Sequence, residues 1–145
     1  MKKKKLFLMT CHVMLAGLLI FCSAAVFNSI RSEQRIKREQ EMSDLYYNGI
    51  ATLEIQKNGS SKVASVDVMS DNVVSDLMME LVTLRKGRVP NKSEDWTYVL
   101  TGYDRNNAKQ YVITVYDSYI SSEGRTYKTT EQFMGYLKTL WRNKT

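Results

Sequence analysis

Residues 6–27, LFLMTCHVMLAGLLIFCSAAVF, form an almost unbroken apolar run directly behind the four lysines at positions 2–5. As a helix rising about 1.5 Å per residue, this run would be roughly 33 Å long, which is enough to cross the hydrocarbon core of a bilayer. We therefore predict a transmembrane helix over residues 6–27 and a basic cytoplasmic tail over residues 1–5. The lipid bilayer is the first partner that the sequence predicts.

The same segment shares features with a cleavable secretory signal, because it has a basic start and a small-residue site at residues 23–25, SAA. The apolar core of such a signal usually covers only about 7–15 residues. Here the run is longer and continues through Val26 and Phe27, and a charged stretch follows it. We expect an uncleaved signal anchor. The alternative is a cleaved, secreted small binding or inhibitor protein.

Positive charges on the two sides of the run predict the orientation of the chain. The lysines at positions 2–5 abut the apolar run, whereas Arg31, Arg35, Lys37 and Arg38 are spread over the segment after it. Since basic residues next to a span stay preferentially in the cytoplasm, we expect a single-pass protein of the cell membrane with its N-terminus inside. Residues 28–48 then form a polar juxtamembrane helical linker, and residues 49–145 an extracytoplasmic domain.

Charge gives little support for a nucleic-acid partner. Four of the 21 basic residues are the N-terminal lysines, and all 15 acidic residues follow residue 28, so the rest of the chain carries 17 basic against 15 acidic residues. The tightest basic cluster lies around Arg85 and Arg88, where a helix is expected to end. We predict no nucleic-acid binding.

The apolar run contains both cysteines and the only histidine of the chain: Cys11, Cys22 and His12. The domain therefore has no disulfide, no Ser–His or Cys–His nucleophile pair and no His/Cys zinc site. A small secreted animal domain would usually carry disulfides, so their absence favours a bacterial cell surface. We predict no catalytic residue, cofactor or metal site.

Carboxylates remain as the candidates for acid–base chemistry. Glu94 and Asp95 are adjacent, so their side chains diverge on an extended chain, and Asp104 and Asp117 are typical turn residues. No glycine-rich phosphate loop or nucleophile elbow accompanies them. We expect a protein that is not an enzyme, and an enzyme using only Asp, Glu, Tyr or Lys is the weakest alternative.

The hydrophobic pattern of the domain alternates between two periods. A period of two predicts strands at residues 50–56 and 62–68 around an Asn58-Gly59 turn, and further strands at 96–101, 109–116, 119–121 and 125–128. The last two are short strands or one strand interrupted by a turn. Apolar residues at spacings of three and four predict helices at residues 71–84 and 129–141. The order ββ-α-βββ-α predicts an α+β fold, a two-layer sandwich of an antiparallel sheet and two helices.

Aromatic residues are enriched in the second half of the predicted sheet. Alternation places Tyr116, Tyr119 and Tyr127 on the open side of that sheet, and exposed tyrosines suit contacts with proteins or glycans. These three residues form the predicted binding face. The sequence thus predicts a membrane-anchored, extracytoplasmic, non-enzymatic binding or modulator module for a protein or cell-wall ligand.

Overall fold

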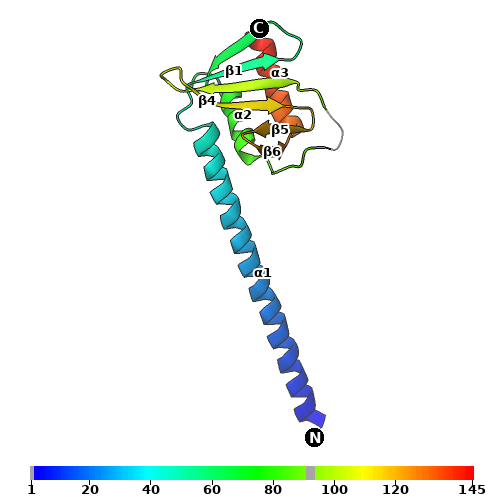
Figure 1. The fold of residues 1–145 in the computed structure, drawn as a ribbon. Coiled ribbons are helices and arrows are strands. Elements are labelled where there is room, and N and C mark those ends of the chain that lie inside the picture. The colour runs from blue at the N-terminus through cyan, green and yellow to red at the C-terminus, as the bar shows by residue number, and fades with distance from the viewer. Residues whose placement is uncertain (1, 91–93) are drawn as a thin grey trace. The chain divides into compact units, whose positions relative to one another are not determined.

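The computed structural model describes the backbone of residues 2–90 and 94–145, with side chains at Met14 and from residue 20 onward within those ranges. The chain divides into two compact units, residues 1–38 and residues 39–145. Helix α1 (Lys2–Tyr46) supplies the first unit and enters the second. The second unit is an α+β domain (Figure 1).

In the first unit, every side chain from residue 20 to residue 37 is exposed. The guanidinium of Arg31 lies 5.5 Å from the centroid of the Phe27 ring, one turn away. Within the part of the chain that the structure describes, none of the helices combines the length and the apolar character that a membrane span needs. Most of the predicted span, residues 6–13 and 15–19, lies outside the residues with described side chains, so the span stays a prediction.

The second unit contains one six-stranded, fully antiparallel sheet in the order β2-β1-β3-β4-β5-β6. Strands β1 (Thr52–Lys57) and β2 (Val63–Asp67) form a hairpin, and β1 pairs on its other side with β3. The remaining strands follow as a meander: β3 (Tyr98–Tyr103), β4 (Lys109–Val115), β5 (Tyr119–Ser122) and β6 (Arg125–Lys128). The predicted antiparallel sheet is confirmed.

Helices α2 (Asn72–Thr83) and α3 (Glu131–Lys144) lie on the same side of the sheet (Figure 1). Their apolar stripes, including Leu77, Leu81, Phe133 and Leu137, are fully buried. The strands alternate buried and exposed residues, so one face of the sheet packs on the helices and the other stays uncovered. This is the two-layer arrangement that the sequence predicted.

Asp71 caps α2, because its side chain accepts a hydrogen bond from the main-chain N–H of Val73. The helix ends at Thr83, and the basic segment 85–87 leaves it to run beside β6. Thr130 caps α3, because its hydroxyl accepts a hydrogen bond from the main-chain N–H of Phe133. Thr129 instead donates a hydrogen bond to the main-chain oxygen of Asp117.

Two strands, not one interrupted strand, precede α3. Glu123 and Gly124 both adopt positive φ, 49° and 74°, which is the geometry of a tight hairpin turn. The chain therefore reverses there, and β5 and β6 pair from Tyr119 with Lys128 to Ser122 with Arg125. The element order after α2 is four strands and a helix.

The last two turns of α1 belong to the core of the second unit. Met42 and Tyr46, which the sequence placed in the polar linker 28–48, are 2% and 0% exposed. Two apolar residues one turn apart were too sparse to predict an amphipathic stripe, yet they lie on the same helix face and both pack into the domain.

Candidate functional site

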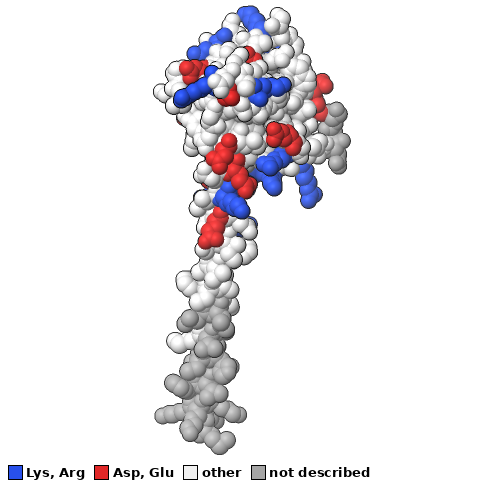
Figure 2. Space-filling view, turned by 60° about the vertical axis from the view of Figure 1, so that its left-hand side comes forward, with Lys and Arg blue, Asp and Glu red and all other residues white. Residues whose placement is uncertain are grey.

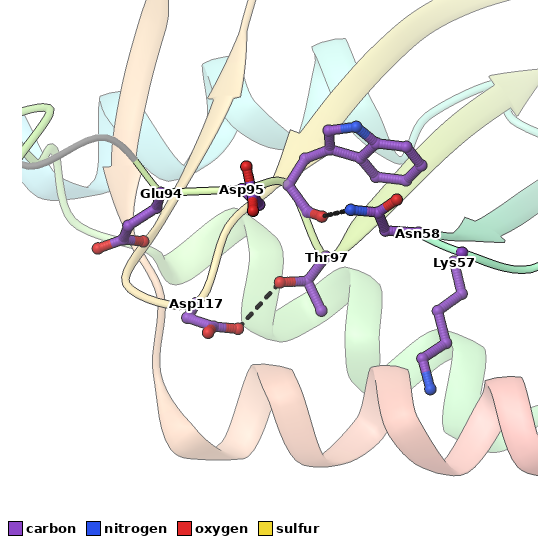
Figure 3. A pocket seen from close by; sticks show the side chains of 8 residues that line it. Lys57, Asn58, Glu94, Asp95, Thr97 and Asp117 are labelled. Carbon is purple, nitrogen blue, oxygen red and sulfur yellow. Dashed lines mark hydrogen bonds between the residues drawn. The ribbon is translucent and has the colours of Figure 1, made fainter.

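A hollow of about 800 Å³ lies where three connections meet at one end of the sheet. The end of β1 provides Lys57, and the turn after it provides Asn58 and Gly59. The segment before β3 provides residues 94–97, and the β4–β5 turn provides Asp117. Figure 3 shows Lys57 on one side of this hollow and the carboxylates of Glu94, Asp95 and Asp117 on the other.

Asn58 donates two hydrogen bonds to main-chain oxygens of the segment before β3, and these bonds hold the β1–β2 turn in place. Its side-chain amide donates to the oxygen of Trp96 at 2.8 Å, and its main-chain N–H donates to the oxygen of Thr97 at 3.0 Å. Gly59 has a φ of 75°, which a side chain would strain. The Asn-Gly pair therefore both turns the chain and fixes one wall of the hollow.

Two of the three carboxylates that line the hollow, Glu94 and Asp117, are anchored by hydrogen bonds from neighbouring hydroxyls. Asp117 accepts from the hydroxyl of Thr97 at 2.9 Å (Figure 3). Glu94 accepts from both the hydroxyl and the main-chain N–H of Ser118, at 2.7 and 3.3 Å. Glu94 and Asp117, two of the four carboxylates considered as acid–base candidates, therefore have a structural role in stabilising turns.

Asp104 has the turn role that the sequence predicted for it. One of its oxygens accepts from the main-chain N–H groups of Asn106 and Ala108, and the other from the side chain of Gln110. It lies in the β3–β4 connection and does not line the hollow. Among the residues whose side chains the structure describes, no set of three or more His, Cys, Asp and Glu could hold a metal ion.

Lys57, Asp95 and Trp96 give the hollow its capacity for contacts. The side chains of Lys57 and Asp95 make no hydrogen bond to any described residue, so an ammonium donor and a carboxylate acceptor face solvent. Trp96 directly follows Asp95 in the sequence, is half-buried, and adds an apolar indole with one N–H donor. This combination suits a polar ligand held by hydrogen bonds and by one aromatic side chain.

The prediction that Tyr116, Tyr119 and Tyr127 are exposed on the open side of the sheet is wrong. Tyr127 is 1% exposed and Tyr119 is 8% exposed, and only Tyr116 is half-buried. The rings of Tyr116 and Tyr119 stack 4.2 Å apart and nearly parallel, at 9°, on either side of the Asp117-Ser118 turn. Burial and the neighbouring Tyr116 raise the pKa of the Tyr119 phenol.

The strand register gives the reason for the burial of Tyr127. Val115 pairs with Ile120, and Ile120 pairs with Tyr127, so the three side chains form one row across β4, β5 and β6. Val115 and Ile120 are both fully buried under the helices, and Tyr127 must share their face. The alternation within one strand shows which of its residues share a face. Which of the two faces is buried depends on the register with the neighbouring strands, so the alternation alone could not reveal the burial of Tyr127.

The lining residues Lys57, Asn58 and Trp96 were not predicted as a site. The sequence predicted a strand beginning at Trp96, but β3 begins at Tyr98. The two residues before it leave the alternation, and Trp96 lines the hollow instead. The one sequence feature that could have indicated this site is the position of Trp96, directly after Glu94 and Asp95 and just before a predicted strand.

On the face of the domain in view in Figure 2, lysines and arginines are intermixed with acidic residues.

The chain matches no known protein family, no curated protein and no solved structure.

Proposed function

We propose that this chain is a membrane-anchored, extracytoplasmic, non-enzymatic binding module whose hollow beside Trp96 takes a ligand of the cell surface. The observation that carries the binding role is that hollow, where an ammonium, a solvent-facing carboxylate and an indole come together. The tether is supported by the apolar run at residues 6–27 behind four lysines.

The way the hollow is built supports binding over catalysis. Glu94 and Asp117 are each engaged by a hydroxyl of the same domain. Asp95 is the one carboxylate of the hollow without a described hydrogen bond, and it lies exposed at the rim, whereas a general acid or base needs a reacting group within reach and a nucleophile needs an adjacent base. Contacts without a chemical step are the role that this set of side chains fits best.

Binding is tested with full-length protein in mild detergent, sedimented with isolated bacterial cell-wall sacculi and, separately, with washed protoplast membranes. Trp96→Ala is compared with Tyr103→Ala, because both aromatic residues are half-buried and Tyr103 lies at the opposite end of β3. Loss of a central aromatic contact typically costs 2 kcal/mol or more, so we expect affinity to fall about tenfold or more in Trp96→Ala alone.

Equal sedimentation of both variants with either material would contradict a ligand site at Trp96.

The mass of the mature protein separates this proposal from the cleaved, secreted alternative. Cleavage near Ala25 would remove the apolar run and leave a protein without a tether.

A further inference from the structure

Strand β2 lies at one edge of the sheet and presents unpaired main-chain groups. The N–H of Val68 donates to the oxygen of Ala51 at 2.9 Å, so the main chain of Val68 faces the β1 side. Since antiparallel strands alternate the direction of their main-chain groups, those of Val63, Ser65 and Asp67 face outward. No described main-chain group pairs with Val63 or Ser65 on that side.

The opposite edge of the sheet is closed by the chain itself. The N–H of Lys128 on β6 donates to the oxygen of Arg85 at 2.8 Å, and the N–H of Gly87 donates to the oxygen of Thr126 at 3.0 Å. Lys86 and Tyr127 form an antiparallel bridge between these bonds. The segment after α2 thus covers β6, while β2 has no such cover in the described ranges.

The free edge also lacks most of the usual protection against strand pairing. Residues 63–67, VASVD, contain no lysine, arginine or proline, and the pairing of β2 with β1 has no bulge. Apolar side chains flank the edge: Val63 is 51% exposed, and Met69, just beyond the strand, is 80% exposed. Asp67 is the single charge within the strand.

We propose that the outer edge of β2 pairs antiparallel with β2 of a second copy of this chain, about a two-fold axis at Ser65. The two-fold operation sets the N–H of each Ser65 against the carbonyl oxygen of the other, and the small side chains of Ala64 and Ser65 leave room for the approach. The two sheets become one continuous sheet.

The flanking residues fit a second copy in this register. Val63, which is exposed in the single chain, lies opposite Asp67 of the other copy at each end of the paired strands. The two Asp67 carboxylates stay about 13 Å apart, because four residues separate them along the strand.

A disulfide test uses the full chain in its membrane, with Cys11→Ala and Cys22→Ala as background. The Cα atoms of a hydrogen-bonded pair are about 5.5 Å apart, which a disulfide can span. Ser65→Cys should therefore give a covalent homodimer on mild oxidation. The control is Gln56→Cys, an exposed residue on the same face of the paired strand β1, and it should give several-fold less.

Equal dimer from both cysteine variants, or none from Ser65→Cys, would overturn the proposal. A Ser65→Cys product that mass spectrometry identifies as a disulfide to a different protein would assign the edge to an extended segment of that partner instead, and would equally overturn it.

A second variant pair tests the hydrogen bonds directly. The N–H of Ser65 faces outward, so Ser65→Pro removes an intermolecular donor without removing a bond to β1, and proline is tolerated at sheet edges. In sedimentation velocity of the full chain in detergent, Ser65→Pro should weaken dimerisation about tenfold or more, and Ser65→Thr should keep it. An unchanged dimer in a folded Ser65→Pro chain would refute the pairing.

Discussion

The hydroxyl of Tyr111 on β4 donates a hydrogen bond of 2.9 Å to the main-chain oxygen of Tyr46 in the last turn of α1. The two rings meet edge to face with their centroids 5.1 Å apart, and both side chains are buried. Because the last carbonyls of a helix have no partner within it, the Tyr111 hydroxyl both satisfies one and fixes the end of α1 on the sheet. The end of α1 is therefore a structural part of the domain.

The two tyrosines should respond differently to loss of their hydroxyls. The Tyr46 hydroxyl is buried beside Ser122, whose own hydroxyl donates to the main-chain oxygen of Val112, whereas the Tyr111 hydroxyl donates directly to a main-chain oxygen. Tyr111→Phe leaves a buried carbonyl unsatisfied and should cost about 1–3 kcal/mol, while Tyr46→Phe should be nearly neutral or stabilising. Urea unfolding of both variants measures this, and equal destabilisation would show that the Tyr46 hydroxyl is satisfied.

Truncation should reveal where the folding unit begins. A chain starting at Glu39 keeps Met42 and Tyr46, and we expect it to unfold cooperatively. A chain starting at Asn48 loses both buried side chains, and removing a large buried side chain usually costs 2–5 kcal/mol. Thermal melts should therefore show a much lower midpoint, or no cooperative transition, for the shorter chain. Identical melts would place the last turns of α1 outside the folding unit.

Two glycine substitutions should have opposite effects. A Cβ on Gly102 would lie 2.5 Å from two ring carbons of Tyr111, a ring already held in place by its bond to Tyr46. Gly102→Ala should therefore destabilise the domain by about 1–3 kcal/mol. Gly135 lies inside α3 with open space around its Cβ position, so Gly135→Ala should stabilise by about 0.5–1 kcal/mol. Chemical denaturation distinguishes the two, and a harmless Gly102→Ala would contradict the close packing.

Asp71 should make stability depend on acid pH. Its carboxylate lies 3.1 Å from the ammonium of Lys144 and caps α2, and the hydrogen bond from Lys144 is the main cause that lowers the pKa of Asp71. A lowered folded pKa stabilises the protein above the ordinary carboxyl pKa, and this contribution is lost as the pH falls through the folded value.

Asp71→Asn isolates this contribution, because it keeps an oxygen for the helix cap and removes the charge. At pH 7 the substitution should cost about 0.2–1 kcal/mol, as surface ion pairs do, and the difference from the parent chain should shrink as the pH falls below the ordinary carboxyl pKa and through the lowered pKa of Asp71. Asp71→Ala should cost about 1 kcal/mol more at neutral pH, because it also removes the cap. A pH-independent gap for Asp71→Asn would argue against the ion pair.

The sequence predicted the elements of the domain better than their relation to one another. The stripe through Leu77 and Leu81 and the Asn58-Gly59 turn were recognisable because their signals are local. The exposure of Tyr127 depends on its register with Ile120, and the burial of Tyr46 depends on contact with Tyr111, 65 residues away. Such long-range pairings leave no periodic trace in the chain.

The candidate site shows the same limit. Its carboxylates were visible in the sequence, but the hydroxyls that engage Glu94 and Asp117 come from neighbouring segments of the fold. Trp96 leaves the strand alternation only because β3 begins two residues later than the pattern predicted. A site assembled from three connections could be named only once the sheet had brought their ends together.

The most direct test of the account is the fate of the full-length chain in membranes of intact cells. We predict that it stays in the pellet after alkaline carbonate extraction, as the bilayer span proposed for residues 6–27 requires. We also predict that protease added to intact cells digests residues 39–145, as the proposed location of the domain outside the cell requires. Full-length protein released by carbonate, or a domain digested only after lysis, would contradict the membrane-anchored extracytoplasmic module.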